Sequence, residues 1–288
     1  MIQFQLAQKS TKPAKIAVLG QSGAGKTLAS LLLAKGLTNK GKVLVFDTEN
    51  GRASLKEGHP LLEGWQFYHY PIAPEKASGK VALEVVQEAV AQSFDCVIID
   101  SCSHLWDHVI ETKEKLGGSW TYWAAAKEPY YTFIRKGVIS SPIHIILTLR
   151  TEIKYEQQVN ETSGKKEVVK LGLSPVAEKN LQYEIDFVFN IIDRFHRTLC
   201  EKQEGDLFST TTPFVIEESH GVLISQWLKS GAVDPVLEKK RLFINRIKEL
   251  ISNIEDESKY ISIVPDVSLL EDMTIEELTS IGKQLKSL

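Results

Sequence analysis

One eight-residue stretch, GQSGAGKT at residues 20–27, restricts the possible folds of this chain more than any other. It satisfies the pattern GxxxxGK[ST], in which glycines let backbone N–H groups turn inward around phosphate oxygens. The apolar run KIAVLG leads into the stretch, and the helix-forming run TLASLLLAKGL leads out of it. A helix N-terminus adds partial positive charge to such a loop. We therefore predict that the chain binds a nucleoside triphosphate here.

Each residue of this loop has an expected role in binding a triphosphate. The Lys26 ammonium is expected to reach the terminal phosphates, and the Thr27 hydroxyl is the expected protein ligand of Mg²⁺. The remaining positions surround the phosphates with backbone, and these are Gly20, Gln21, Ser22, Gly23, Ala24 and Gly25. A glycine-rich turn without a ligand is the alternative, and the flanking strand and helix argue against it.

Apolar runs alternate with helical stretches through the first half of the chain. KIAVLG, KVLVF, FDCVIID and PIHIILTL are continuous enough to be strands buried on both faces. WQFYHY is typical of a peripheral strand, and VALEVVQEAVAQS is typical of an amphipathic helix. The alternation predicts right-handed βαβ crossovers and an α/β fold with a mainly parallel sheet.

The pattern changes after this alternating region. Residues 151–172 are polar and lysine-rich, which favours a mobile loop or a hairpin. The later runs IDFVFNII, RTLCEK, FVIEE and VLISQW are typical of strands that close an antiparallel extension. From Asp234 onward apolar residues recur at helical spacing. We therefore predict a core of residues 1–228 and a small helical module of residues 229–288.

Composition limits the partners and the compartment. The 288-residue chain has a formal net charge of −3, which excludes a constitutive basic coat for nucleic acid but not a local basic groove. The N-terminus MIQFQLAQKS has no apolar signal segment, and no apolar run approaches the roughly 20 residues that span a bilayer. We therefore expect a cytoplasmic protein without a membrane partner. Three cysteines without a CxxC pair fit reduced thiols better than disulfides or a zinc site.

Hydrolysis requires a carboxylate beside the metal and a base for the attacking water. Asp100 ends the buried run FDCVIID and is the expected metal partner, with a helix N-cap as its alternative role. The next residue, Ser101, is unable to act as the base. Glu49 follows the run VLVF in the segment DTEN, and we predict that it activates water. An exposed loop acid is the alternative.

Thr148 ends the strand-like run that begins at residue 142. If that strand lies between the strand of the phosphate loop and the strand of Asp100, Thr148 faces the γ-phosphate as a sensor. Threonine is also a common strand residue, so its presence there has a purely structural explanation as well.

These segments, taken in order, resemble the RecA-like branch of P-loop ATPases. GQSGAGKT, FDTENG, FDCVIIDSCSHLW and HIILTLR follow its pattern, in which the catalytic glutamate follows the second core strand and a serine follows the metal aspartate. Glu49 and Asp100 occupy those positions. The chain is more closely similar to AAA-domain, RecA-like ATPases of bacteriophages and prophages, some of which are linked to recombination by single-strand annealing. Further similar segments are SSPIHIILTLRTEIKY, GKKEVVKLGLSPV, NLQYEIDFVFNI and EKQEGDLF.

The resemblance implies ATP as the nucleotide, its hydrolysis, assembly into a ring or filament, and contact with single-stranded DNA in a bacterial or phage-infected cell. RecA-like assemblies place a basic residue of one subunit in the active site of its neighbour. Lys202 is the candidate, and Lys179 and Arg194 are weaker ones; a surface lysine is otherwise unremarkable. The chain departs from RecA because Thr148 stands near the position of its glutamine sensor and the long N-terminal helix is missing. RecA-type strand exchange is therefore in question.

A basic segment follows the predicted sensor strand, where a RecA-like protein carries a DNA-binding loop. Its members are Arg150, Lys154, Lys165, Lys166 and Lys170. Single-strand binding needs such a basic track together with stacking aromatic rings. Intervening glutamates dilute the charge, so a solvated loop is the equal alternative. The aromatic residues before the strand, among them Trp120 and Trp123, are expected in the core or in a subunit interface.

Three functions remain after these arguments. The leading one is a DNA-stimulated ATPase in recombination or annealing. The second is a nucleotide switch or loader that acts on a protein partner through residues 229–288. A small-molecule kinase is the third, and it is disfavoured because a kinase excludes water and normally carries an arginine-bearing lid, whereas the segment 151–172 has no arginine.

Overall fold

The computed structural model describes residues 12–159, 166–230, 235–252, 254, 257–271 and 273–286. Contacts between residues divide the chain into two compact units, with the division between Ser230 and Gly231. The larger unit has an α/β core that contains the phosphate-binding loop, and the smaller unit is helical in its described residues. That residues 1–228 and 229–288 are separate domains stays a prediction.

One sheet forms the centre of the larger unit, with the strand order β3-β2-β4-β5-β1-β7-β8-β9. Its members are β1 (Lys15–Gly20), β2 (Val43–Asp47), β3 (Tyr68–Pro71), β4 (Cys96–Asp100), β5 (His144–Val159), β7 (Phe187–Ile191), β8 (Arg197–Lys202) and β9 (Phe214–Val215). Along this order the strands from β3 to β7 are parallel, and β8 and β9 form an antiparallel extension. The predicted α/β fold is confirmed, and WQFYHY supplies the edge strand β3.

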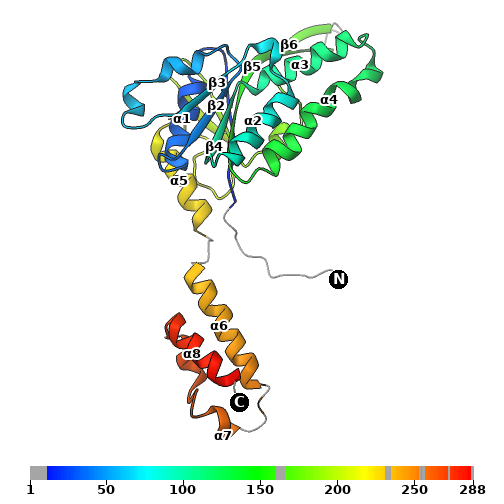
Figure 1. Cartoon of the computed structure of the whole chain (residues 1–288). Helices are drawn as coiled ribbons and strands as arrows, with labels where there is room; N and C mark the ends of the chain where they lie inside the picture. The colour runs from blue at the N-terminus through cyan, green and yellow to red at the C-terminus, as the bar shows by residue number, and fades with distance from the viewer. Residues whose placement is uncertain are drawn as a thin grey trace. The chain divides into compact units, whose positions relative to one another are not determined.

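Helices cover both faces of the sheet (Figure 1). On one face lie α1 (Lys26–Leu37) and α5 (Glu218–Lys229), and on the other lie α2 (Gly79–Ala91), α3 (Cys102–Lys115) and α4 (Trp123–Thr132). Successive strand residues enter opposite cores: Val18 belongs to the core on the α1 side and Leu19 to the core on the α3 side. Burial on both faces explains why the strand sequences are continuously apolar.

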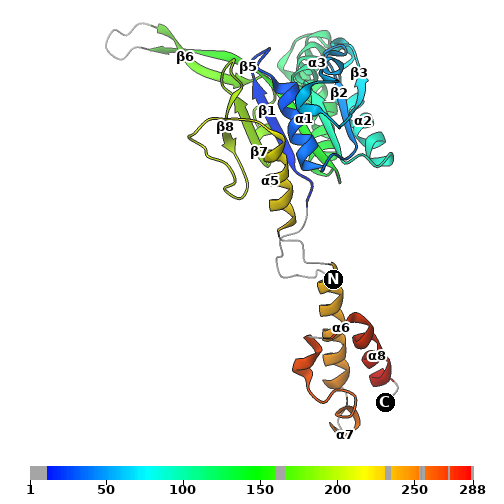
Figure 2. The ribbon, with the colours of Figure 1, turned by 90° about the vertical axis from the view of Figure 1, so that its left-hand side faces the viewer.

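β5 continues past the sheet as one arm of a hairpin (Figure 2). The other arm, β6 (Lys166–Pro175), pairs antiparallel with β5 from Thr151↔Pro175 to Val159↔Lys166. The register shifts between Lys154 and Tyr155. Of the two alternatives for residues 151–172, the described residues therefore form the hairpin.

The run VLISQW is not a strand, and this corrects the prediction from its apolar residues. It lies within α5, whose buried positions Gly221, Ile224 and Leu228 recur at helical spacing toward α1. Glu217 caps the first turn of this helix in a capping box. The cap and the spacing outweigh the local strand preference of a short apolar run, which does not distinguish a strand from a buried helix.

α1 and α5 approach so closely that glycine is required at their crossing. A Cβ atom on Gly36 would lie 2.0 Å from the carbonyl oxygen of Glu218, and one on Gly221 would lie 2.2 Å from the carbonyl oxygen of Leu33. Both clashes involve backbone atoms, which do not move away as a flexible side chain does. The P-loop helix is therefore held against α5 by backbone contact.

The smaller unit has its own apolar core. Its described helices are α6 (Pro235–Ser252), α7 (Glu257–Tyr260) and α8 (Ile275–Lys286). Ile247 of α6 packs with Leu278 and Leu285 of α8. At the start of α8 the Glu277 backbone N–H donates to the Thr274 hydroxyl at 3.3 Å, and the Glu277 carboxylate accepts from the Thr274 backbone at 2.7 Å. These reciprocal bonds form a capping box.

The substitution Gly36→Ala tests the contact between α1 and α5. We expect it to lower the free energy of unfolding by about 1–3 kcal/mol, because the added methyl group forces two backbones apart. Gly282→Ala is the control, since a Cβ at this position in α8 meets nothing within 4 Å. Chemical denaturation monitored by circular dichroism gives both values. A Gly36→Ala variant as stable as the parent would contradict the close approach.

Candidate nucleotide-binding and hydrolysis site

The loop between β1 and α1 has the backbone of a phosphate-binding loop. Gly23 and Gly25 have φ angles of 79° and 97°, in the left-handed region that favours glycine. Gly25 also has no room for a side chain, because a Cβ would lie 2.7 Å from Nδ1 of His196. That same nitrogen is 2.8 Å from the Ala24 carbonyl oxygen. The β7–β8 turn therefore supports the loop through His196, a residue that sequence reasoning missed because it is distant in the chain.

Lys26 points back into the loop. Its ammonium donates to the carbonyl oxygens of Gly20 at 3.0 Å and Gln21 at 2.9 Å. Burial lowers the pKa of Lys26, and the negative charges of Asp100 and Glu49 oppose this effect. Gln21 and Ser22 are exposed on the loop. The lysine is thus placed beside the loop backbone and within the field of both predicted acids.

Asp100 connects the loop helix to the sheet. One carboxylate oxygen accepts a hydrogen bond from the Thr27 hydroxyl at 2.6 Å, and the other accepts one from the Thr148 hydroxyl at 2.5 Å. Burial raises the pKa of Asp100, and the two hydroxyl donors counteract this rise. A hydroxyl and a carboxylate side by side offer the oxygen ligands that Mg²⁺ prefers, and a buried acid gains from a nearby cation. Thr27 and Asp100 therefore fit a magnesium site.

The turn that carries Glu49 is fixed by Asp47, the last residue of β2. One oxygen of the buried Asp47 carboxylate accepts from the Glu49 backbone N–H at 2.7 Å. The other accepts from the Ala53 backbone N–H at 2.7 Å and lies 3.0 Å from Nε2 of His69 on β3. Three contacts on one carboxylate thus determine the course of the chain after β2. The sequence placed Asp47 at a strand end but did not reveal this role.

Glu49 lies two residues beyond Asp47, which stands opposite Asp100 in the register of β2 with β4. The Glu49 carboxylate is 3.3 Å from the Arg52 guanidinium, and 23% of the side chain is exposed. After burial, the negative charge of Glu49 is a further cause of the raised pKa of Asp100. The negative charge of Glu49 therefore influences the pKa of both Asp100 and Lys26. The role of Glu49 as the base stays a prediction.

The ends of β2 and β4 are tied together by Thr48. Its hydroxyl accepts a hydrogen bond from the Ser101 backbone N–H at 2.8 Å and lies 2.7 Å from Nδ1 of His104 on α3. Its backbone N–H donates to the Asp100 carbonyl at 2.7 Å. Burial lowers the pKa of His104, and the positive charge of Arg150 adds to this effect, which favours the neutral imidazole. Sequence reasoning missed Thr48 and His104.

The strand order meets the condition set for Thr148, because β5 lies between β1 and β4. Thr148 stands opposite Val18 in the register, and its hydroxyl donates to Asp100. The side chain is fully buried. Thr148 therefore positions Asp100, the predicted metal ligand, through a direct hydrogen bond. Contact of Thr148 with a γ-phosphate stays a prediction.

Arg150 lies two residues beyond Thr148 and opposite Gly20 in the register of β5 with β1. Its guanidinium forms an ion pair with Asp107 of α3. Its positive charge contributes, after burial, to the lowered pKa of Lys26. Arg150 thus belongs to the surroundings of the phosphate loop, and the predicted DNA contact of this residue is untested.

The remaining predicted site residues are Lys202 and the lysines of the predicted basic segment. The Lys202 ammonium donates to the carbonyl oxygens of Gln182 at 3.2 Å and Tyr183 at 3.0 Å. Lys165 lies outside the described residues. The other three hairpin lysines, Lys154, Lys166 and Lys170, lie on β5 and β6, where only the backbone is described. Roles for these five residues stay predictions, as they do for Lys179 and Arg194.

The sheet order, the phosphate loop and the Thr27–Asp100 hydrogen bond define a RecA-like P-loop ATPase fold, which confirms the class predicted from the sequence. The sequence matches the AAA domain family over residues 12–212 of the 288-residue chain, and the chain belongs to this family. No curated protein sequence matches it. None of the helices in the described residues is long and apolar enough to cross a membrane.

One similar solved structure is the flagellar accessory protein FlaH from Methanocaldococcus jannaschii. The two chains are 12% identical with a TM-score of 0.41, and the similarity covers 72% of this chain and 89% of that chain.

The substitution Thr148→Val tests the hydroxyl that supports Asp100. Removing a donor from the ionised carboxylate raises the Asp100 pKa, so the acid limb of Mg²⁺-dependent nucleotide binding moves to higher pH. At neutral pH we expect Mg²⁺–nucleotide affinity to fall about tenfold, as for loss of a hydrogen bond to a charged group. Thr148→Ser keeps the hydroxyl and is the control. Titration calorimetry across pH measures both effects, and an unchanged acid limb would refute the role of Thr148.

Proposed function

We propose that the protein hydrolyses ATP and uses the reaction cycle to act on single-stranded DNA during recombination or strand annealing. Membership of the AAA domain family and the phosphate loop support nucleotide binding. The single observation that supports hydrolysis is that Glu49 follows Asp47 at the end of β2, where Asp47 stands opposite Asp100 in the register of β2 with β4. Activation of water requires a base close to the metal and the phosphates.

Residues of the phosphate loop and of the strand ends have separate roles in the proposed reaction. Lys26 and the loop backbone hold the phosphates, and Thr27 with Asp100 holds Mg²⁺, which neutralises phosphate charge when bound. Glu49 orients the attacking water and accepts its proton. Asp47 keeps the Glu49 turn in place through its backbone hydrogen bonds.

Arg150 is the proposed link between the nucleotide and the hairpin. It stands on β5, which lies between β1, the strand that leads into the phosphate loop, and β4, the strand that ends at Asp100. Its guanidinium is paired with Asp107. A terminal phosphate competes with Asp107 for this guanidinium, because Arg binds both groups with the same fork of donors. β5 continues from Arg150 into the hairpin, so a change at the phosphate reaches the hairpin through one strand.

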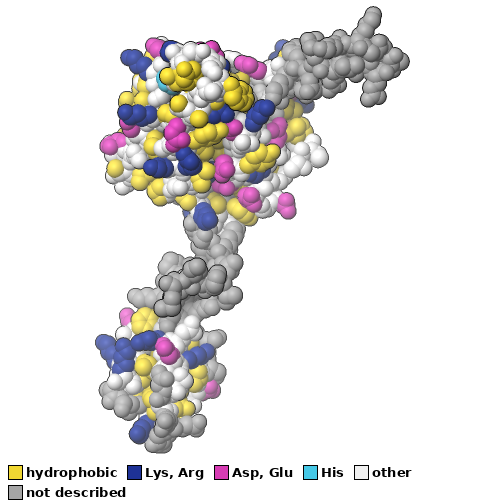
Figure 3. Space-filling view, turned by 90° about the vertical axis from the view of Figure 1, so that its right-hand side faces the viewer, with side chains coloured by type: hydrophobic (Ala, Val, Ile, Leu, Met, Phe, Trp, Pro, Cys, Tyr) yellow, Lys and Arg dark blue, Asp and Glu magenta, His cyan; other side chains and the backbone are white. Residues whose placement is uncertain are grey.

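A local surface has to provide the DNA contact. The face of the larger unit in Figure 3 mixes hydrophobic, basic and acidic side chains, in keeping with the net charge of −3. The support for DNA comes from the hairpin, where Lys154, Lys166 and Lys170 are spaced along β5 and β6. Lysine contacts with DNA phosphates do not depend on the base sequence, so we propose that the protein binds single-stranded DNA with little sequence preference.

Homo-oligomerisation into a ring or filament in the cytoplasm completes the proposal. In such an assembly Lys202 enters the neighbouring active site, with Lys179 and Arg194 as alternatives. The carbonyl groups that Lys202 contacts in its own chain belong to Gln182 and Tyr183, and Tyr183 is 78% exposed. The exposed Tyr183 ring supports a contact of this part of the surface with another subunit.

A second candidate function is a nucleotide switch or loader that acts on a protein partner. The observation in its favour is the separate apolar core of the C-terminal unit, in which Ile247, Leu278 and Leu285 pack together. A compact helical unit that follows an ATPase core in the sequence can serve as a docking module. It requires no contact with DNA.

The substitution Glu49→Gln tests the catalytic assignment. Loss of the base should reduce kcat by about 10²- to 10⁴-fold while ATP affinity stays the same, because general base catalysis contributes about this much. Glu57→Gln changes an exposed acid in the same connection between β2 and β3 and should have no effect. Phosphate release and nucleotide titration measure the two quantities. Normal turnover by Glu49→Gln would show that another group activates water.

The ATPase rate with and without single-stranded DNA separates the candidate functions. We expect stimulation by DNA that fades as salt increases, since phosphate contacts release counterions. Stimulation by a protein partner alone would favour the switch. Phosphate transferred to an added small-molecule acceptor would favour a kinase and contradict hydrolysis as the function.

A further inference from the structure

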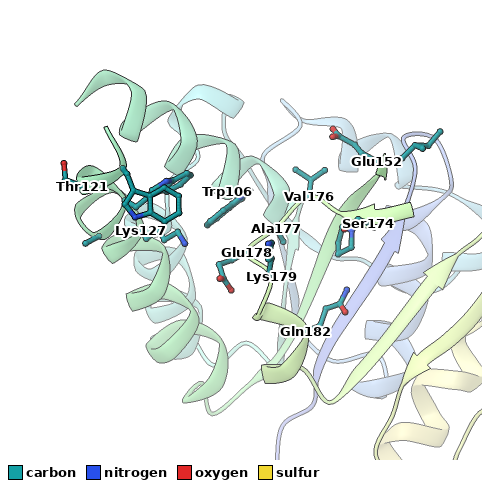
Figure 4. Close-up of a pocket in the computed structure, with 15 residues that line it drawn as sticks. Trp106, Thr121, Lys127, Glu152, Ser174, Val176, Ala177, Glu178, Lys179 and Gln182 are labelled. Atoms are coloured by element: carbon teal, nitrogen blue, oxygen red, sulfur yellow. The ribbon is translucent and has the colours of Figure 1, made fainter. Parts of the chain in front are cut away.

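A groove of about 930 Å³ lies between the helical layer and the base of the β5–β6 hairpin. Figure 4 shows its two walls: Trp106 and Lys127 project from α3 and α4, and Ser174 and Gln182 lie on the opposite side. This volume is in the range of sites that hold a ligand of substantial size. The residues that hold the nucleotide do not line it.

One wall of the groove consists of three tryptophans. The rings of Trp106 and Trp123 are stacked, with 6.1 Å between centroids and an interplanar angle of 11°. Trp120 meets Trp123 edge to face at 6.5 Å and is 83% exposed. The sequence predicted Trp120 and Trp123 in the core or in a subunit interface. The structure places Trp120 at the surface, in the short 3₁₀ helix η4 (Trp120–Tyr122), and a subunit interface there stays a prediction.

Cations accompany these rings. The Lys127 ammonium lies 5.4 Å from the centroid of Trp106 and 5.2 Å from that of Trp123, and Lys179 lies on the opposite wall. Within the described part of the chain neither lysine has a carboxylate partner. Of the acids in the groove, Glu178 is already engaged, since its carboxylate accepts from the Asn180 backbone at 2.6 Å. The lysines are therefore available to an anion.

The groove continues into the hairpin. Glu152 and Ile153 of β5 and Ser174 and Pro175 of β6 line it, and Glu152 stands opposite Ser174 in the register. The next residue of β5 is Lys154, one of the lysines predicted to contact DNA. A ligand that fills the groove and extends along the hairpin thus passes aromatic faces first and basic positions afterwards.

We propose that this groove binds single-stranded DNA, with bases stacked on Trp120 and Trp123 and phosphates beside Lys127 and Lys179. The exposed Trp120 ring, the half-buried Trp123 ring beside it and two lysines without a carboxylate partner match a strand that presents rings and negative charge together. Stacking and phosphate contacts are the two contributions to single-strand binding. The inference rests on the proposed DNA function, and it assigns the base contacts to the groove instead of the hairpin alone.

The groove is also connected to the ATP site. Trp106 precedes Asp107 on α3, and Asp107 is the ion-pair partner of Arg150. If a phosphate draws Arg150 away from Asp107, α3 loses a contact one residue from an aromatic wall of the groove. DNA affinity therefore depends on the bound nucleotide.

Trp120→Ala tests the proposal in the full chain. We expect it to weaken binding of a fluorescein-labelled oligothymidylate between about fivefold and a hundredfold in fluorescence anisotropy, as for loss of one stacked base. ATP affinity and the DNA-independent ATPase rate should not change, because Trp120 does not touch the phosphate loop. Lys127→Gln should reduce the slope of log K against log salt by about 0.7, as for one lost phosphate contact on a single strand.

Tyr68→Ala is the matched control. Tyr68 is 55% exposed on the edge strand β3, and the Lys42 ammonium is 5.3 Å from its ring, so it has the same chemistry at another place. It should bind the oligonucleotide as the parent does. Equal losses in both variants would show that exposed aromatic rings contribute nonspecifically and would overturn the assignment.

Cross-linking distinguishes the remaining outcomes. A single strand that carries 5-iodouracil should cross-link to the peptide containing Trp120 and Trp123. If the parent protein binds no single-stranded DNA, the proposed function itself fails. If it binds DNA but Trp120→Ala binds equally well and the cross-links lie elsewhere, only the groove assignment fails. A Trp120→Ala variant with normal DNA affinity and a changed oligomeric state would identify the groove as a contact between copies of the chain.

Discussion

The ATP site depends on the hydrogen bonds that the buried Asp100 carboxylate accepts. This carboxylate accepts hydrogen bonds from Thr27 on α1 and from Thr148 on β5, while Asp100 itself ends β4. A buried acid without compensation is costly, so these donors favour one arrangement of helix and strands. The register of β5 between β1 and β4 follows from the same constraint, because a shift by one residue would turn Thr148 away from Asp100.

The second acid depends on backbone geometry. Asp47 binds the backbone of Glu49 and Ala53, and Thr48 joins the end of β2 to the end of β4. Glu49 therefore lies on a turn but has a position set by the sheet. Its remaining contact is with the exposed Arg52 guanidinium, and an exposed ion pair contributes little stability. The carboxylate is free to change partner during the proposed reaction while its backbone stays fixed.

Much of the fold and the centre of the site were predictable from the sequence because they depend on local patterns. The run GQSGAGKT and the strand ends at Asp47 and Asp100 set the phosphate loop and the acids. The contact of Thr148 with Asp100 needed the strand order, which periodicity does not reveal. VLISQW was misassigned because its apolar residues are contiguous, while the contact that decides its structure is with α1. The aromatic groove combines segments far apart in the chain, so no local pattern indicates it.

The unbroken course of β5 restricts how relatives of this protein can vary in length. Thr148 near the phosphate loop and Ile153 in the groove lie on the same strand, and side chains alternate along it. An insertion or deletion of one residue between them would exchange the two faces of everything beyond it. Length variation among homologues is therefore expected beyond the groove, whereas the spacing between the phosphate loop and the aromatic wall is inherited as a unit.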